Sequence, residues 1–324
     1  RPGTALMETR TLLLDTADRM FADLCDKRAL DAAEAGRFPD ALLAVVTEGG
    51  FQQLAMKASG VDLADALAVL RVAGRHAVPL PLAEIVLANR WLDSDAELVS
   101  IGMGDAQQAI GVPWGRRADA VISLAPDGGA FLLRGLTVAE GANLAGEPRD
   151  QVRGKNSEPI EVGEDAYALM ALTRVVLMAG ALERALELSI AYVSEREQFG
   201  RPIAKFQAIQ HHMAVMAAET AAAIRAADAA LDGLGTDRSL QEVAVGKSRV
   251  GEAVGVVAEL AHQVHGAMGY THEHRLHHTT RRLWSWRDEY GSERYWQQRL
   301  GQHLTGLVAG RGPDALWSFI ATRG

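Results

Sequence analysis

The segment from Tyr192 to Gln207 has residue types that could bind a phosphate-bearing ligand. It reads YVSEREQFGRPIAKFQ and lies where one long amphipathic pattern ends at a glycine-proline turn and another begins. Arg196 carries a planar guanidinium that can pair with a pyrophosphate. Gln207, eleven positions later, carries an amide that can both donate and accept hydrogen bonds. Taken alone, Arg196 could instead be a charge at a helix C-terminus and Gln207 a surface residue.

A second segment, from Gln263 to Glu273, reads QVHGAMGYTHE and is rich in small residues. Glycine there would allow the backbone to approach a ligand closely, because it has no Cβ to block the approach. Without the first segment, this glycine pattern would indicate only the end of a helix. The two segments lie about sixty residues apart, and both fall in a region that favours long helices.

Together the two segments resemble the flavin-binding signatures of the acyl-CoA dehydrogenases, where such residues contact the flavin of a neighbouring subunit. The resemblance implies FAD-dependent α,β-dehydrogenation of an acyl-CoA thioester, in an oxidoreductase acting on CH-CH bonds. Ala267 stands where many relatives have a second glycine. The residues that the resemblance assigns to FAD in these segments are Arg196, Gln198, Phe199, Gln207, Gln263, Val264, His265, Gly266, Ala267 and Gly269.

The chemistry also needs a carboxylate against the α-carbon of the thioester, desolvated enough to be basic. The resemblance places this base in the stretch WRDEYGSER, residues 286–294, where an ungapped comparison puts Tyr290 at the base position. Glu289 is one residue earlier and is the expected catalytic base, with Asp288 a weaker candidate. The alternative is that both carboxylates form surface ion pairs with Arg282 or Arg287.

Some relatives instead carry the base on the first long C-terminal helix, but residues 167–174 contain no carboxylate. Ser292 and Glu293 follow the loop as flavin-contacting residues do in relatives. A second functional hypothesis is therefore a non-catalytic partner subunit that completes the flavin site of a heteromeric dehydrogenase. Arg196, Gln207 and Gln263 would keep their roles under that hypothesis.

The resemblance also implies partners: an acyl-CoA substrate, an electron-transfer flavoprotein as acceptor, and a homo- or hetero-oligomer. A tetramer is expected, with an unlike short subunit as one option. The barrel segments that wrap the flavin ring in longer relatives are missing between residues 92 and 165, so the resemblance is to short bacterial members, several of them linked to steroid degradation. A bulky, steroid-derived acyl group would then have room.

Hydrophobic periodicity indicates a mainly α fold in three parts. We expect an N-terminal helical domain over 1–94, a small reduced β domain over 95–165 and a C-terminal helical bundle of four-helix type over 166–324. Long helices are predicted over 166–197, 204–231 and 239–265. Short strands are predicted at 120–124 and 130–133, with strand-like segments at 137–138 and 160–162, and residues 149–159 are predicted as a polar loop.

Composition narrows the function classes. The net charge of −8 argues against a nucleic-acid binder, although the arginines and tryptophans of residues 281–296 could otherwise suggest base stacking. Cys25 is the single cysteine, so no internal disulfide can form, which fits a reducing cytoplasm. No uninterrupted apolar run approaches the roughly 20 residues that span a bilayer, so no membrane association is expected.

Four histidines lie within seven residues and invite comparison with a metal site: His272, His274, His277 and His278. Neighbouring histidines on one segment rarely converge on one ion, and a zinc site needs a defined set of converging ligands. We therefore expect no metal here, and polar packing near the second glycine segment instead.

Overall fold

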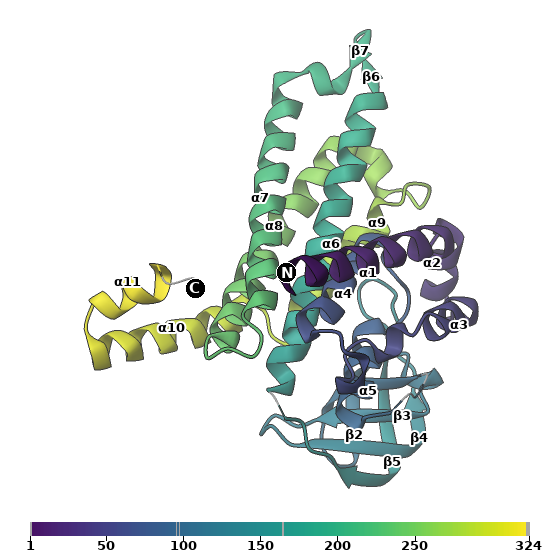
Figure 1. The fold of residues 1–324 in the computed structure, drawn as a ribbon. Coiled ribbons are helices and arrows are strands. Elements are labelled where there is room, and N and C mark those ends of the chain that lie inside the picture. Colours follow the sequence, from purple (N-terminus) through teal and green to yellow (C-terminus); the bar gives the residue numbers. More distant parts are fainter. Residues whose placement is uncertain (1, 95, 97, 164, 322–324) are drawn as a thin grey trace.

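The computed structural model describes residues 2–94, 96, 98–163 and 165–321. N-terminal helices and a small barrel pack against the lower part of a long helical bundle (Figure 1). The N-terminal helices are α1 (Pro2–Leu24), α2 (Lys27–Glu34), α3 (Asp40–Glu48), α4 (Leu63–His76) and α5 (Leu82–Leu92). The C-terminal helices are α6 (Ala166–Glu195), α7 (Gln207–Asp232), α8 (Ser239–His265), α9 (Leu276–Asp288), α10 (Glu293–Arg311) and α11 (Asp314–Ala321). The mainly α fold is confirmed.

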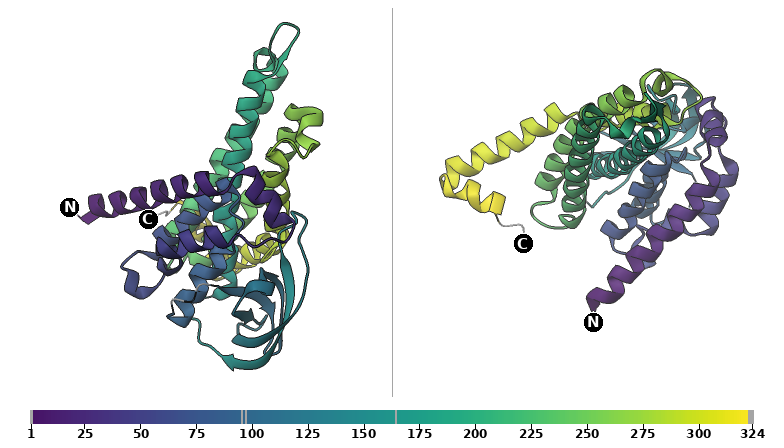
Figure 2. Two further views of the ribbon diagram at one scale, coloured as in Figure 1. Left: turned by 90° about the vertical axis from the view of Figure 1, so that its right-hand side faces the viewer. Right: turned by 90° about the horizontal axis from the view of Figure 1, so that it is seen from above.

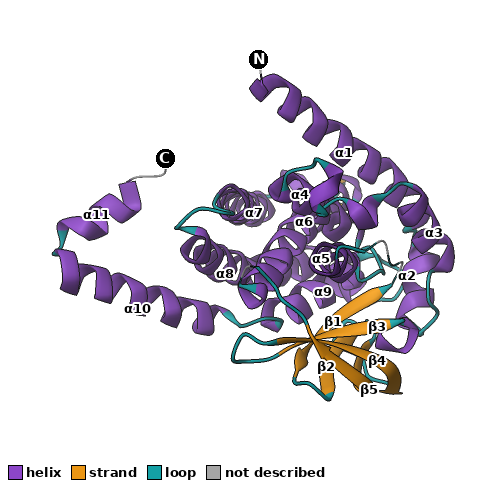
Figure 3. Cartoon of the chain, turned by 60° about the horizontal axis from the view of Figure 1, so that its bottom comes forward, coloured by secondary structure: helices purple, strands orange, loops and turns teal. Residues whose placement is uncertain are grey.

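The β region is a closed barrel with the strand order β1-β2-β5-β4-β3. Its strands are β1 (Val99–Gly104), β2 (Gln108–Pro113), β3 (Ala120–Leu124), β4 (Ala130–Ala139) and β5 (Arg149–Pro159). All neighbouring strands are antiparallel except β1 and β3, which pair in parallel and close the barrel. The barrel lies beneath the helices, against α5 and α9 (Figure 3).

Two sequence predictions in the barrel are wrong. The segment predicted as a polar loop is strand β5, which pairs with β4 along most of its length. Only Asp150 and Val152 of β5 are buried, so its apolar content is too low to indicate a strand, and its backbone is held by neighbours that are distant in sequence. The segment 160–162 lies beyond the end of β5 and is not a strand.

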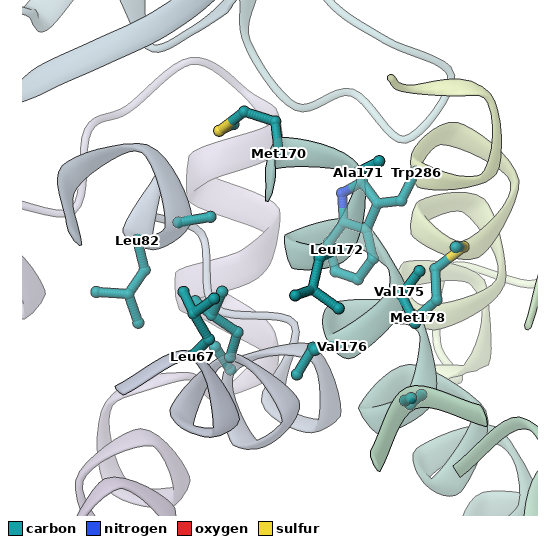
Figure 4. Close-up of a cluster of buried hydrophobic side chains, with 14 of the residues drawn as sticks. Leu67, Leu82, Met170, Ala171, Leu172, Val175, Val176, Met178 and Trp286 are labelled. Atoms are coloured by element: carbon teal, nitrogen blue, oxygen red, sulfur yellow. The ribbon is translucent and has the colours of Figure 1, made fainter. Parts of the chain in front are cut away.

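Helix α6 forms the centre of the molecule. The largest hydrophobic core contains buried residues from the N-terminal helices, the barrel, α6 and α9. Leu67 of α4, Leu82 of α5 and Trp286 of α9 surround the α6 side chains Leu172 and Val176 (Figure 4). Helix α6 is long and apolar enough to cross a membrane by length and composition alone, but 83% of its most apolar window is buried inside the protein. It is therefore the core helix of the bundle.

Helices α4 and α6 cross at two glycines. A Cβ added to Gly180 would collide with the backbone carbonyl oxygen of Arg71, and one added to Gly74 would collide with that of Leu177. The crossing thus brings backbone against backbone, and no side chain fits between the helices.

Gly180→Ala is therefore expected to lower the free energy of unfolding by roughly 1–3 kcal/mol, because the added methyl group must push the two backbones apart. Gly255→Ala is the matched control, since Gly255 is also helical but has open space where its Cβ would lie. That exchange should be neutral or stabilising by up to about 1 kcal/mol. Equal effects of the two exchanges in denaturant titrations would contradict the close crossing.

Candidate functional site

A small hairpin connects α6 to α7 at the end of the bundle farthest from the barrel (Figure 1). It consists of β6 (Glu197–Gln198) and β7 (Arg201–Pro202). The turn residues Phe199 and Gly200 both have positive φ angles, +54° and +77°, as a tight two-residue turn requires. The Phe199 side chain is 92% exposed. Positive φ is costly for an aromatic residue and marks a place where function can outweigh local stability.

An open cleft of about 460 Å³ lies between this hairpin and the turn that follows α8. Figure 2 shows the hairpin and the end of α8 rising beyond the rest of the molecule. The cleft brings the two sequence segments together. Its lining residues are Tyr192, Arg196, Gln198, Phe199, Ile203, Phe206, Ile209, Gln263, Val264, His265, Gly266, Ala267 and Met268.

Two residues of these segments that were assigned to the ligand from sequence do not line this cleft. Gln207 is the exposed first residue of α7. Gly269 is buried beneath the turn, where an added Cβ would lie 3.0 Å from the Cβ of His265. Gly269 therefore serves close packing of the turn within this chain.

The cleft suits an anionic ligand with a planar group. Arg196 makes no ion pair with any residue that the structure describes, so its guanidinium is available to a phosphate. Gly266 has φ +56° and ψ −138°, which only glycine adopts readily, and the space beside it is open. The ring of His265 stacks on that of Tyr192, with centroids 4.4 Å apart. Burial lowers the pKa of His265 to about 4, so this ring is neutral at pH 7.

The carboxylate of Glu289 lies elsewhere, in a buried ion-pair network between α5, α6, α9 and the start of β5. The Nε of Arg149 lies 2.8 Å from Oε1 of Glu289, and the Nε of Arg174 lies 2.6 Å from Oε2. Arg174 also pairs with Glu84 on α5 at 2.5 Å. Glu289 is thus held by two arginines, each on a different element.

These contacts decide the acidity of Glu289. Burial raises the pKa of this carboxyl group, but the charges and hydrogen bonds of Arg149 and Arg174 outweigh burial and lower the pKa to about 2. Glu289 therefore forms ion pairs, as the alternative hypothesis expected, but its partners are Arg149 and Arg174 and not the two arginines named there. Arg282 pairs with Glu34, and Arg287 pairs with Glu293. Asp288 is exposed at the end of α9.

The network borders a small, partly open cavity of about 40 Å³ lined by residues of α2, α4, α5, α6, α9 and the barrel with its loops. Glu84, Glu147, Arg149 and Arg174 contribute to its wall. A cavity of this size has room for a few water molecules.

Ser292 and Glu293 are also far from the hairpin cleft. Ser292 precedes α10, and the buried Glu293 forms an ion pair with Arg287. Arg174 lies in the first third of α6 and Arg196 directly follows its C-terminus, which puts them roughly 33 Å apart at 1.5 Å per helical residue. The candidate base region and the candidate phosphate cleft of one chain are thus separate sites.

Sequence reasoning missed the arginines of the network, although one signal was present. Arg174 is the single charged residue between positions 166 and 182 of an otherwise apolar helix, and such a charge requires a buried partner. Lys247 was missed as well. Its Nζ donates to the carbonyl oxygens of Trp286 and Arg287 at 3.2 and 2.8 Å and so caps α9, while burial lowers its pKa to about 7.

Comparisons with known protein families and sequences identify acyl-CoA dehydrogenases. Residues 165–294 match the family described as "Acyl-CoA dehydrogenase, C-terminal domain". Acyl-CoA dehydrogenase IpdE2 of Mycolicibacterium smegmatis is 28% identical over 300 residues, which cover 84% of this chain and 91% of that protein. Acyl-CoA dehydrogenase IpdE2 of Mycobacterium tuberculosis is 31% identical over 238 residues, which cover 68% and 71%.

Solved structures show the same fold. The ChsE4–ChsE5 complex from Mycobacterium tuberculosis contains a chain that superimposes with a TM-score of 0.82 at 21% identity, covering 92% of this chain and 97% of that chain. The Tcur3481–Tcur3483 steroid ACAD gives a TM-score of 0.81 at 21% identity, covering 94% and 99%. Both matches extend over the helices and the barrel.

Proposed function

Because this chain belongs to the acyl-CoA dehydrogenase family, we propose that it works in FAD-dependent α,β-dehydrogenation of an acyl-CoA thioester, as one subunit of an assembly that shares each flavin between two chains. The observation that carries this proposal is the hairpin cleft. Two segments sixty residues apart in sequence, each of a type that binds a dinucleotide, line the same hollow at the tip of the bundle.

Six residues of the cleft have specific roles under this proposal. Arg196 would pair with the pyrophosphate, and Gln198 and Gln263 would supply amide hydrogen bonds. Gly266 and Ala267 would let the backbone approach the adenosine half, while the exposed Phe199 would cover the ligand or contact the neighbouring chain. Bound flavin supplies the acceptor for the hydride that leaves the β-carbon. The protein holds the flavin, orients the thioester against it and excludes water from both.

The length of α6 supports sharing of the flavin. A five-carbon ribityl chain joins the ring of FAD to its phosphates, and it is much shorter than the roughly 33 Å between Arg196 and Arg174. Phosphates held at Arg196 therefore leave the ring far from the Glu289 region of the same chain. The ring would lie against another subunit, either a second copy or an unlike short chain.

The second candidate function is the partner subunit that lacks its own base, and the state of Glu289 favours it. A general base works best with a pKa near the operating pH, whereas Glu289 has a pKa of about 2 between two arginines. For Glu289 to act as the base, both Arg149 and Arg174 would have to release it. If this chain is such a partner subunit, a carboxylate of the other chain takes the α-proton of the substrate.

The proposal also covers the acyl group, the electron acceptor and the cellular location. The steroid ACAD among the structural neighbours supports a bulky, ring-bearing acyl group. An electron-transfer flavoprotein as acceptor and a cytoplasmic location, where the buried Cys25 stays a thiol, fit the family chemistry.

Co-purification from the native host tests the function. We expect a yellow assembly that reduces an artificial acceptor with a steroid-derived acyl-CoA and carries flavin at no more than one per chain. A colourless chain that stays monomeric with added FAD, in the presence of every co-purifying protein, would contradict the proposal.

Phe199→Ala separates assembly from folding. The side chain is almost fully exposed, so its removal should change the free energy of unfolding of the isolated chain by less than about 0.5 kcal/mol. Flavin retention by the assembly should fall several-fold, as measured by absorbance after gel filtration. Unchanged retention would show that the hairpin tip contacts neither ligand nor partner.

A further inference from the structure

A second cluster of chemically competent side chains lies between α2 and α9, outside both regions described above. Asp31, His277 and His278 each offer one ligand atom, and these atoms lie within 4.8 Å of one another. The neighbouring histidines were expected not to converge, but their ring centroids are 4.0 Å apart. His277 and His278 are 8% and 1% exposed.

Both histidines are oriented through Nδ1. Nδ1 of His278 lies 2.7 Å from Oε1 of Glu34, and Nδ1 of His277 lies 2.7 Å from the carbonyl oxygen of His274. An oxygen acceptor at Nδ1 fixes the proton there and leaves Nε2 as a free electron pair. Metal-binding histidines are held in this way by a carboxylate or a backbone carbonyl.

The two Nε2 atoms remain without a hydrogen-bond partner among the residues that the structure describes. Nε2 of His278 lies 3.1 Å from Oδ1 of Asp31, close enough for an ion pair but without hydrogen-bond geometry. Buried polar atoms are rarely left unpaired. Here two such nitrogen atoms lie close together, and the Nδ1 atom of each ring already has its own hydrogen-bond partner. A bound cation would satisfy both Nε2 atoms at once.

Asp31 can serve such an ion without losing its existing contact. Its Oδ2 accepts from Lys27 at 2.6 Å, and its Oδ1 faces His278. One oxygen is therefore committed to the surface lysine, and the other is available as a ligand.

We propose that Asp31 Oδ1, His277 Nε2 and His278 Nε2 form a binding site for a divalent transition-metal ion such as Zn²⁺. Two imidazole nitrogens and one carboxylate oxygen are a ligand set that zinc accepts, with water in the fourth position. Glu34 is the carboxylate behind His278. The ion would join α2 to α9, segments more than two hundred residues apart, and so fix the N-terminal helices to the bundle.

Cobalt binding tests the site, because Co²⁺ in such a site absorbs visible light through ligand-field transitions. Tag-free protein, treated with chelator, is titrated with Co²⁺ and then with Zn²⁺. We expect one Co²⁺ per chain, displacement by Zn²⁺, and a rise in melting temperature with Zn²⁺ that chelator reverses. Asp31→Asn and His277→Gln should each weaken binding at least about tenfold.

Asp23→Asn is the matched control, since Asp23 is an exposed carboxylate on α1 and should leave binding unchanged. Asp31 is itself partly exposed, so its exchange for asparagine tests the site without a large change in the core. No visible band at one equivalent of Co²⁺ would overturn the proposal and leave His278 as an ion-pair partner of Asp31 and Glu34. Binding of Co²⁺ by the Asp31→Asn and His277→Gln variants as tight as that of the unaltered protein would overturn it as well.

Discussion

Arg196→Ala is expected to weaken FAD retention by the assembled protein roughly 10- to 100-fold. A hydrogen-bonded charge contributes about 1.5–3 kcal/mol, and each 1.4 kcal/mol changes an equilibrium constant tenfold. Arg196→Lys should recover part of the loss, because lysine keeps the charge but not the planar fork. Flavin absorbance after gel filtration and fluorescence titration with FAD measure the effect. Turnover of Arg196→Ala should recover when FAD is supplied in excess.

Arg201→Ala is the matched control for that exchange. Arg201 lies on the same hairpin, and its guanidinium packs over the ring of Phe206, but it does not line the cleft. The same charge is therefore lost from the same hairpin, and FAD retention should change by less than about threefold. If Arg201→Ala and Arg196→Ala reduce FAD retention equally, the loss reflects only the lower positive charge of the hairpin. The assignment of Arg196 to the phosphates would then be wrong.

Glu289→Gln is expected to destabilise the fold while leaving turnover per bound flavin within a few-fold of the starting protein. Removing one partner of a buried ion pair costs about 3–5 kcal/mol, and here Arg149 and Arg174 would each keep one other carboxylate, Glu147 and Glu84, so the loss should lie at or below the lower end of that range. A general base contributes 10²- to 10⁴-fold to a rate. A loss of turnover of that size, with stability unchanged, would identify Glu289 as the base and remove the partner-subunit candidate.

The pH dependence of stability gives a second measurement on the same variant. The pKa of Glu289 is about 2 in the folded chain and 4.5 ordinarily, so the unfolded chain binds the proton more tightly. Its contribution, roughly 3 kcal/mol, is fully present above about pH 4.5 and is lost as the pH falls toward 2. Glu289→Gln should make this acid destabilisation less steep. Asp288→Asn, at the exposed neighbour, is the control and should leave stability unchanged.

Much of the fold could be predicted from the sequence because its long helices have strong amphipathic patterns. The observed bounds of α6 and α8 agree with the predicted helices to within two residues, and α7 begins three residues later than predicted. Strand β5 could not be found in the same way. Its residues are mostly polar and exposed, and its pairing with β4 and β2 depends on a barrel that closes only in three dimensions.

The two candidate regions differ in how far the sequence could predict them. The hairpin cleft was predictable, because Arg196 and Gly266 lie in compact segments whose spacing resembles a known family. The ion-pair network was not, because Glu84, Arg174 and Glu289 come from distant elements and no local pattern joins them. Glu289, Ser292 and Glu293 stay predictions as functional residues, and so does the role of Gln207, which lies on the surface of the isolated chain.

A density map of the purified yellow assembly tests the shared flavin most directly. The FAD phosphates are expected to lie within about 3 Å of the guanidinium of Arg196 in one chain, with the flavin ring against a different chain. A flavin whose ring and phosphates are both held by a single chain, away from the cleft between the hairpin and Gly266, would contradict this expectation.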